Sequence, residues 1–318
     1  MRYVQPRVQM FAGDASRRLV ASSGAVRSQF SDGRWHFQHG PIDLIIGADG
    51  DAGAIAAAVQ MAWLRFQSML SELVGELPIL RLPIEHASDV QGEVARRMVA
   101  ACHPHRDMFI TPMAAVAGAV ADELIESFRI DERIVRAHIN NGGDIALHLT
   151  PGYSYRVGIY ADLNRLKRRE ILHLDGDIEI AADTAIRGVA TSGWRGRSSS
   201  LGIADSVTVL ANCAACADAA ATLIANSVDV DDPVILRRPA RELNDDSDLG
   251  ERLGTVGVGR LSQQSIACAL DAGEVVAQSM CDRQIIDGAA LWLAGQARIV
   301  GKRNQNPASR GIRMNVIQ

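Results

Sequence analysis

Asp218 and Thr222 are the residues whose types and spacing point most directly to chemistry. They lie four positions apart, after the apolar run 206–211 and among small residues, so a helix would place both on one face. An ionised carboxylate in apolar surroundings needs a partner, and a hard cation with oxygen ligands would supply one. The helix alone leaves an alternative open, in which Asp218 is solvated and the Thr222 hydroxyl bonds back to a main-chain carbonyl.

A second polar group lies between two predicted strands. Its members are Asn141, Gly142, Gly143 and Asp144. The glycines permit positive φ and a close approach of a ligand to the backbone, and the amide and carboxylate could hydrogen-bond a nucleotide, a ribose or an isoalloxazine edge. Asn-Gly is equally a signal for a tight hairpin turn. His138 and His148 flank this turn and could act as bases or as core histidines.

Two further segments could contact phosphate. Hydroxyls, glycines and arginines follow one another at Thr191, Ser192, Gly193, Arg195 and Arg197, a composition that suits a pyrophosphate but also an ordinary polar loop. Residues 113–119 open a helix of small residues, whose N-terminus favours anions and whose carbonyls could bind a cation. Close helix packing is the simpler interpretation of that helix, and its small residues fit an internal contact or the seam of a homodimer equally well.

The five cysteines do not suggest a disulfide scaffold, because their number is odd and the chain is long. Cys213 and Cys216 form a C-x-x-C motif at the start of the Asp218 helix, where a lowered thiol pKa would permit redox or persulfide chemistry. They are alternatively small buried hydrophobes. A structural zinc site lacks a second C-x-x-C pair, and residues 102–105 (Cys-His-Pro-His) offer only a weak metal motif.

Composition excludes several classes of function. The 318 residues are 47% hydrophobic and 4% aromatic with a net charge of −4, which disfavours a nucleic-acid or membrane-binding surface. Residues 1–9 are polar and lack the apolar region of a signal peptide, and the longest apolar run, 108–121, is too short to cross a bilayer. We therefore expect a soluble, cytoplasmic protein.

Hydrophobic periodicity and turn signals predict an α+β fold with a largely antiparallel sheet. We expect one domain over residues 1–300, with two lobes as an option, and a polar C-terminal tail over 301–318. The expected helices cover 51–77 (ending before Pro78), 88 or 89 to 101, 112–128 (capped by Thr111), the Asp218 segment and 263–286. The expected strands cover 35–39, 42–47, 134–139, 144–149, 155–162, 170–174, 177–180, 207–211 and 290–300.

Four of these segments, in this order, resemble motifs of the ApbE-like superfamily, whose best-known members are FAD:protein FMN transferases. The matching segments are Met113–Asp122, Asn140–Asp144, Thr191–Gly193 and Ala217–Thr222. The chain is most similar to a UPF-class branch of shorter, unsecreted relatives. The resemblance implies a T-fold-related architecture in which largely antiparallel sheets pack with long helices.

The resemblance also implies a site. Mg²⁺ would be held by Asp218, Thr222 and the carbonyl of Ala114, which are the oxygen ligands that a hard cation prefers. The cation would bridge the pyrophosphate of FAD or a related nucleotide while a flavin-phosphoryl group is transferred. The turn Asn141–Asp144 would lie along the flavin, and Thr191, Ser192, Gly193 and Arg195 would contact the cofactor as well.

Two departures from the transferase pattern limit this inference. Ala117-Gly118 stands where the transferases carry Lys-Gly, and the segment 193–205 contains neither a histidine nor an Asp-Pro pair, so a general base is not evident. The alternatives are a metabolic protein of the same fold that handles sulfur through Cys213 and Cys216, and a non-catalytic binding protein in which Asp218 only orders the structure.

Overall fold

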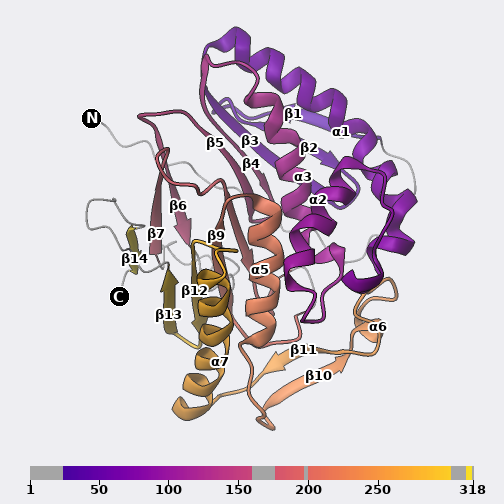
Figure 1. The fold of residues 1–318 in the computed structure, drawn as a ribbon, viewed down its shortest axis with the longest axis vertical. Helices are drawn as coiled ribbons and strands as arrows, with labels where there is room; N and C mark the ends of the chain where they lie inside the picture. Colours follow the sequence, from indigo (N-terminus) through magenta and orange to yellow (C-terminus); the bar gives the residue numbers. More distant parts are fainter. Residues whose placement is uncertain (1–23, 160–175, 197–199, 302–312, 317–318) are drawn as a thin grey trace.

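The computed structural model describes residues 24–159, 176–196, 200–301 and 313–316. Its centre is a nine-stranded sheet in the order β1-β2-β3-β4-β5-β8-β9-β12-β13 (Figure 1). Every neighbouring pair in this sheet is antiparallel, which confirms the predicted fold class. The strands are β1 (Val26–Gln29), β2 (Trp35–His39), β3 (Ile42–Gly50), β4 (Ile134–Asn141), β5 (Asp144–Leu149), β8 (Gly188–Ser192), β9 (Ser206–Ala211), β12 (Gly288–Leu293) and β13 (Gln296–Gly301).

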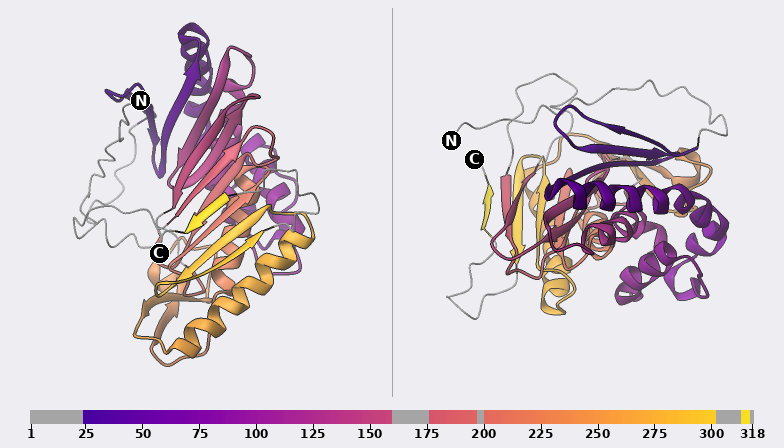
Figure 2. Two further views of the ribbon diagram at one scale, coloured as in Figure 1. Left: turned by 90° about the vertical axis from the view of Figure 1, so that its left-hand side faces the viewer. Right: turned by 90° about the horizontal axis from the view of Figure 1, so that it is seen from above.

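Helices cover one face of this sheet, as the two views in Figure 2 show. They are α1 (Ala52–Leu80), α2 (Glu93–Cys102), α3 (Val116–Ile125), α5 (Ala214–Ser227) and α7 (Gln263–Asp282), with short 3₁₀ turns at Ile84–His86, His103–His105, Pro112–Ala115 and Glu126–Phe128. The main hydrophobic core fills the space between these helices and the sheet. Within the described residues, no helix is both long enough and apolar enough to cross a membrane.

Smaller elements complete the fold. A three-stranded antiparallel sheet of β6 (Ser154–Ile159), β7 (Gly176–Ala181) and β14 (Arg313–Val316) packs Ile178 and Ile180 against Leu210 and Trp292 on the other face of the large sheet. The hairpin β10 (Ile235–Pro239) and β11 (Leu253–Val258) carries the short helix α6 (Ala240–Leu243) next to it. The predicted strand 170–174 lies outside the described residues.

Several predicted boundaries were wrong because tertiary contacts set them. Asp51 is the N-cap of α1, accepting a bond from the Ala54 amide at 2.9 Å, and the helix continues past the predicted end at residue 77, through Pro78 to Leu80. Proline in the last turn removes only one helical bond, so the helix does not have to end there. The second helix begins at Glu93, because the Glu76 carboxylate of α1 accepts bonds from the Gln91 and Gly92 amides at 2.8 and 2.7 Å.

The predicted strand 290–300 is in fact the hairpin of β12 and β13. Ala294 and Gly295 form its turn with φ values of 48° and 80°. Positive φ at both central positions is the geometry of a tight hairpin turn, and an alanine in the first position conceals that signal. Thr111 likewise does not cap a helix, since its hydroxyl donates to Asp248 instead.

Gly188 allows α5 to lie directly on β8. A Cβ atom at this position would stand 2.0 Å from the main chain of Cys213, whereas one at Gly301 would lie 4.0 Å from the Asp287 carbonyl oxygen. We expect Gly188→Ala to lower the free energy of unfolding by about 3 kcal/mol or more, because neither backbone can move aside. Urea unfolding checks this, with Gly301→Ala as the strand control expected within about 0.5 kcal/mol of wild type. Equal losses in the two variants would contradict the assignment.

Candidate functional site

The Asp218 carboxylate lies where α5 meets the start of α3. It accepts a bond from the Gly118 amide at 3.0 Å and a second bond from the Ala117 amide. The two helices approach closely enough for this because Gly118 has no side chain: a Cβ atom there would lie 2.3 Å from the Ala214 carbonyl oxygen. The small residues of α3 therefore serve an internal contact that brings main-chain groups to Asp218.

The β4–β5 turn borders the same place. The Asn141 side chain donates to the Ala117 carbonyl at 3.1 Å, and the Gly143 amide donates to the Asn140 side chain at 2.8 Å. Gly142 and Gly143 have φ values of 68° and 123°, so the turn needs glycine at both positions. The Asn-Gly-Gly segment is thus a tight hairpin turn, as its alternative interpretation proposed, and its first residue is also tied to the Asp218 contact.

Asp144 connects the turn to β8, since its carboxylate accepts a bond from the Thr191 amide at 3.2 Å. The Thr191 hydroxyl in turn shares a 3.1 Å hydrogen bond with the hydroxyl of Thr208 on β9. The structure thereby gathers four residues that the sequence singled out in separate segments, namely Asn141, Asp144, Thr191 and Asp218. We refer to these residues, with the main chain of Ala117 and Gly118, as the carboxylate site.

The ionised forms of the two carboxylates of this site, Asp144 and Asp218, are electrostatically disfavoured. Burial raises the pKa of Asp144 to about 7. Burial, and then the nearby charge of Asp144, also raise the pKa of Asp218 well above its ordinary value. Among the described residues, neither carboxylate has an ion pair with lysine or arginine. A bound cation would relieve this repulsion.

The oxygen atoms of the site suit a hard cation such as Mg²⁺. Thr222 follows Asp218 by one helical turn on α5, and no described residue hydrogen-bonds its hydroxyl. No cluster of three or more His, Cys, Asp or Glu side chains able to hold a metal occurs in the described part of the chain, so hydroxyl or carbonyl oxygens would have to complete the ligands. Ala114 lies in the 3₁₀ turn before α3, and the main-chain groups that contact Asp218 belong to Ala117 and Gly118.

Asp122 is a residue that the sequence argument passed over. Its buried carboxylate accepts bonds from the Ala214 and Ala215 amides at 2.9 and 2.8 Å. Amides in the first turn of a helix have no acceptor within that helix, so Asp122 caps α5, the helix that carries Asp218. The signal that could have found Asp122 is a carboxylate at the end of the Met113–Asp122 motif, within a helix of small apolar residues. A carboxylate in such surroundings needs a partner.

Arg195 is already engaged by a neighbouring carboxylate. Its guanidinium donates to Asp205 at 3.1 Å and lies 4.6 Å from the centre of the Trp194 ring. Asp205 also accepts the Ala294 amide at 2.7 Å, which ties the loop after Ser192 and Gly193 to the β12–β13 turn. Arg195 could reach a phosphate only by sharing or leaving Asp205, and Arg197 lies outside the described residues.

The histidines beside the turn have structural partners. The His138 ring lies 3.3 Å from the Tyr155 hydroxyl and packs on Gly47, where a Cβ atom would come within 2.4 Å of it. Burial lowers the pKa of His138 to about 4. His148 contacts the Ile134 carbonyl at 3.0 Å. Both rings thus have the surroundings of core histidines.

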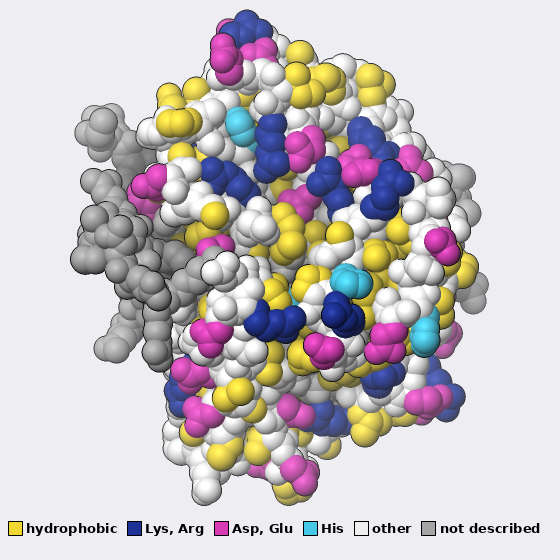
Figure 3. Space-filling view, in the orientation of Figure 1, with side chains coloured by type: hydrophobic (Ala, Val, Ile, Leu, Met, Phe, Trp, Pro, Cys, Tyr) yellow, Lys and Arg dark blue, Asp and Glu magenta, His cyan; other side chains and the backbone are white. Residues whose placement is uncertain are grey.

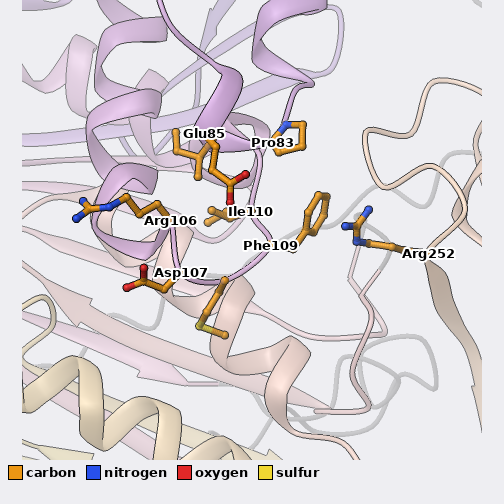
Figure 4. Close-up of a pocket in the computed structure, with 9 residues that line it drawn as sticks. Pro83, Glu85, Arg106, Asp107, Phe109, Ile110 and Arg252 are labelled. Atoms are coloured by element: carbon orange, nitrogen blue, oxygen red, sulfur yellow. The ribbon is translucent and has the colours of Figure 1, made fainter.

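A separate cavity lies away from the carboxylate site. This cavity of about 280 Å³ is lined by residues that include Arg106, Phe109 and Arg252, which Figure 4 labels, and none of the predicted site residues line it. On the face in Figure 3, cationic and anionic side chains are interspersed and do not form a patch of one sign. Cys102 is buried with its thiol 3.5 Å from the Thr111 carbonyl.

Comparison with known proteins identifies the family. A family model described as AbpE bacteria matches residues 27–299. The chain belongs to this ApbE-like family. A UPF0280 protein of Methanopyrus kandleri is 35% identical to it over 208 residues, which cover 64% of this chain and 78% of that protein. A UPF0280 protein of Methanosarcina acetivorans is 32% identical over 198 residues, covering 61% of this chain and 72% of that protein.

Solved structures of ApbE proteins are similar to the ApbE-like chain at low sequence identity. The flavin transferase ApbE from Vibrio cholerae aligns with 87% of this chain and 97% of its own length, at 11% identity and a TM-score of 0.43. The ApbE protein of Thermotoga maritima aligns with 65% of this chain and 87% of its own length, at 14% identity and a TM-score of 0.34.

Proposed function

We propose that the carboxylate site binds a flavin nucleotide, FAD or a close relative, together with Mg²⁺, and that the chain transfers the flavin-phosphoryl group of this nucleotide. The observation that carries the proposal is the pair Asp144 and Asp218, two half-buried carboxylates whose mutual repulsion no described cation relieves. Membership of the ApbE-like family and the ordered set of motifs support the flavin as ligand.

Each part of the site has a role in this proposal. Asp218, Thr222 and a carbonyl of the 114–117 segment hold the cation, which when bound neutralises charge on the pyrophosphate as its bond breaks. The turn Asn141–Asp144 lies along the flavin. Thr191, Ser192 and Gly193 present hydroxyl and amide groups, and Arg195 presents its guanidinium, to the phosphates.

The chemistry is a phosphoryl transfer with a simple balance. An acceptor hydroxyl oxygen bonds to the phosphorus of the flavin half and gives up its proton to water, while the pyrophosphate P–O bond breaks and the adenylate half leaves with the electron pair of that bond. The missing family lysine does not disturb the contact with Asp218, because Ala117 and Gly118 make that contact through their main-chain amides. In this proposal, the residues present serve binding and orientation of the nucleotide.

The experiment that tests this function is a titration of the purified chain with FAD, with Mg²⁺ or with EDTA present. We expect micromolar binding with Mg²⁺ and at least tenfold weaker binding in EDTA, with FMN and AMP each binding more weakly than FAD. Incubation with FAD and Mg²⁺ should then release AMP when an acceptor is present. Absence of FAD binding in both buffers would refute the proposal.

Thr222 provides a graded test of the cation ligands. Thr222→Val keeps the shape of the side chain and removes its hydroxyl, so the Mg²⁺ concentration for half-maximal FAD binding should rise about tenfold, the effect of losing one charge-assisted contact of about 1.4 kcal/mol. Thr222→Ser keeps the hydroxyl and should stay near wild type. An equal effect of both substitutions would argue for a packing role.

A further inference from the structure

Cys213 and Cys216 are two thiols at the start of α5 that the flavin proposal does not use. Cys213 is the N-cap residue, with extended backbone angles (φ −150°, ψ 160°), and its sulfur accepts a bond from the Cys216 amide at 3.2 Å. The two side chains also hydrogen-bond each other. The sulfur of Cys213 is therefore directed at Cys216 within the first turn of the helix.

The backbone around the pair is held on three sides. Gly188 of β8 lies against the main chain of Cys213, and Gly118 of α3 lies against Ala214. Asp122 binds the two amides between the cysteines. Because this turn cannot spread, the thiols are already close before any bond forms, and closing a bond between them costs little conformational entropy.

The pair is also accessible, unlike two of the other cysteines. Cys213 and Cys216 are partly exposed, whereas Cys102 and Cys281 are buried. Cys268 is exposed on α7 and has no cysteine at C-x-x-C spacing. A small reagent can thus reach Cys213, Cys216 and Cys268, and the pair alone among these has a second thiol beside it.

We propose that Cys213 and Cys216 form a reversible dithiol–disulfide site that exchanges with a small-molecule disulfide. One thiolate of the pair attacks a sulfur of that disulfide, whose S–S bond breaks and releases one small thiol. The second thiolate attacks the protein sulfur of the mixed disulfide and releases the other small thiol. The protein loses two hydrogens and two electrons, and the small disulfide gains them.

The test equilibrates the full chain in glutathione buffers of rising oxidised fraction, traps free thiols with N-ethylmaleimide and digests with trypsin. Both cysteines fall in one peptide, 198–237, and Cys268 and Cys281 fall in another, 261–283. We expect the first peptide to change from doubly alkylated to an unalkylated internal disulfide. Raising total glutathione at a fixed ratio should make the pair more reduced, because an internal disulfide depends on the square of the thiol concentration.

Two variants separate this site from ordinary thiol exposure. Cys268→Ser should leave the transition of peptide 198–237 unchanged. Cys213→Ser should abolish the internal disulfide and leave a mixed disulfide with glutathione on Cys216, whose formation depends only on the ratio. Peptide 198–237 of the wild-type chain remaining doubly alkylated in the most oxidised buffer, or carrying bound glutathione throughout, would overturn the proposal. Neither result depends on flavin binding.

Discussion

Asp218→Asn should abolish most of the Mg²⁺-dependent FAD affinity of this chain. The substitution keeps the size of the side chain and removes the charge that the proposed cation would neutralise. Loss of one charged partner from a partly buried, hydrogen-bonded pair costs about 2 kcal/mol, so the affinity in Mg²⁺ should fall about 30-fold. Titration with FAD at constant Mg²⁺ measures the loss, and binding in EDTA should change little.

The stability of the ligand-free variant separates this effect from simple unfolding. Since burial and Asp144 disfavour the ionised form of Asp218, removal of its charge should keep the free energy of unfolding at pH 8 within about 1 kcal/mol of wild type or raise it. Asp246→Asn, at a carboxylate whose side chain is 80% exposed, is the matched control. Unchanged Mg²⁺-dependent binding in Asp218→Asn would remove Asp218 from the cation site.

The second large effect is a pH dependence carried by Asp144. Its pKa is raised from 3.8 to about 7, so between these values the folded chain holds a proton that the unfolded chain has lost. Its contribution to stability is complete at low pH and is lost as the pH rises through 7. Relative to Asp144→Asn, wild type should lose on the order of 1.4 kcal/mol of unfolding free energy for each pH unit over this window.

The comparison with the variant is necessary because buried histidines act in the opposite direction. Burial lowers the pKa of His105 and of His138 to about 4, so their contributions rise with pH over part of the same range. These contributions cancel in the difference between wild type and Asp144→Asn, which urea unfolding at several pH values gives directly. Parallel curves for the two proteins would show that Asp144 ionises normally. Saturating Mg²⁺ should restore wild-type stability at pH 8 and have little effect at pH 5.

Local signals in the chain predicted the parts of the site separately. The Asn-Gly-Gly turn and the helix that carries Asp218 both follow from residues within a few positions of each other, because turn conformation and helix periodicity are short-range properties. Alternating and helical hydrophobic patterns likewise predicted the antiparallel α+β class, and the resemblance of the ordered motifs predicted the family.

Helix boundaries and the contacts between distant segments could not be predicted from neighbouring residues in the sequence. The start of α2 depends on Glu76, which lies in the preceding helix, and the Thr111 hydroxyl is used by Asp248. The Ala114 carbonyl was predicted as a ligand of a cation beside Asp218, and the sequence did not predict that the Ala117 and Gly118 amides hydrogen-bond the Asp218 carboxylate. Which turn of a small-residue helix contacts a carboxylate depends on how two helices cross, and that is decided by packing of whole surfaces.

The amino-acid sequence by itself determined the residue types of this site and the local elements that carry them. Tertiary structure alone decided that Asp144 and Asp218 lie near each other in one half-buried place, and that Asp122 caps α5 beside them. The physical reason is that turns and helices depend on near neighbours in the chain, whereas burial and electrostatic repulsion depend on which surfaces meet after folding. Gly118 on α3 and Gly188 on β8 let these elements pack directly on the start of α5, because only a residue without a side chain allows the backbones to approach so closely.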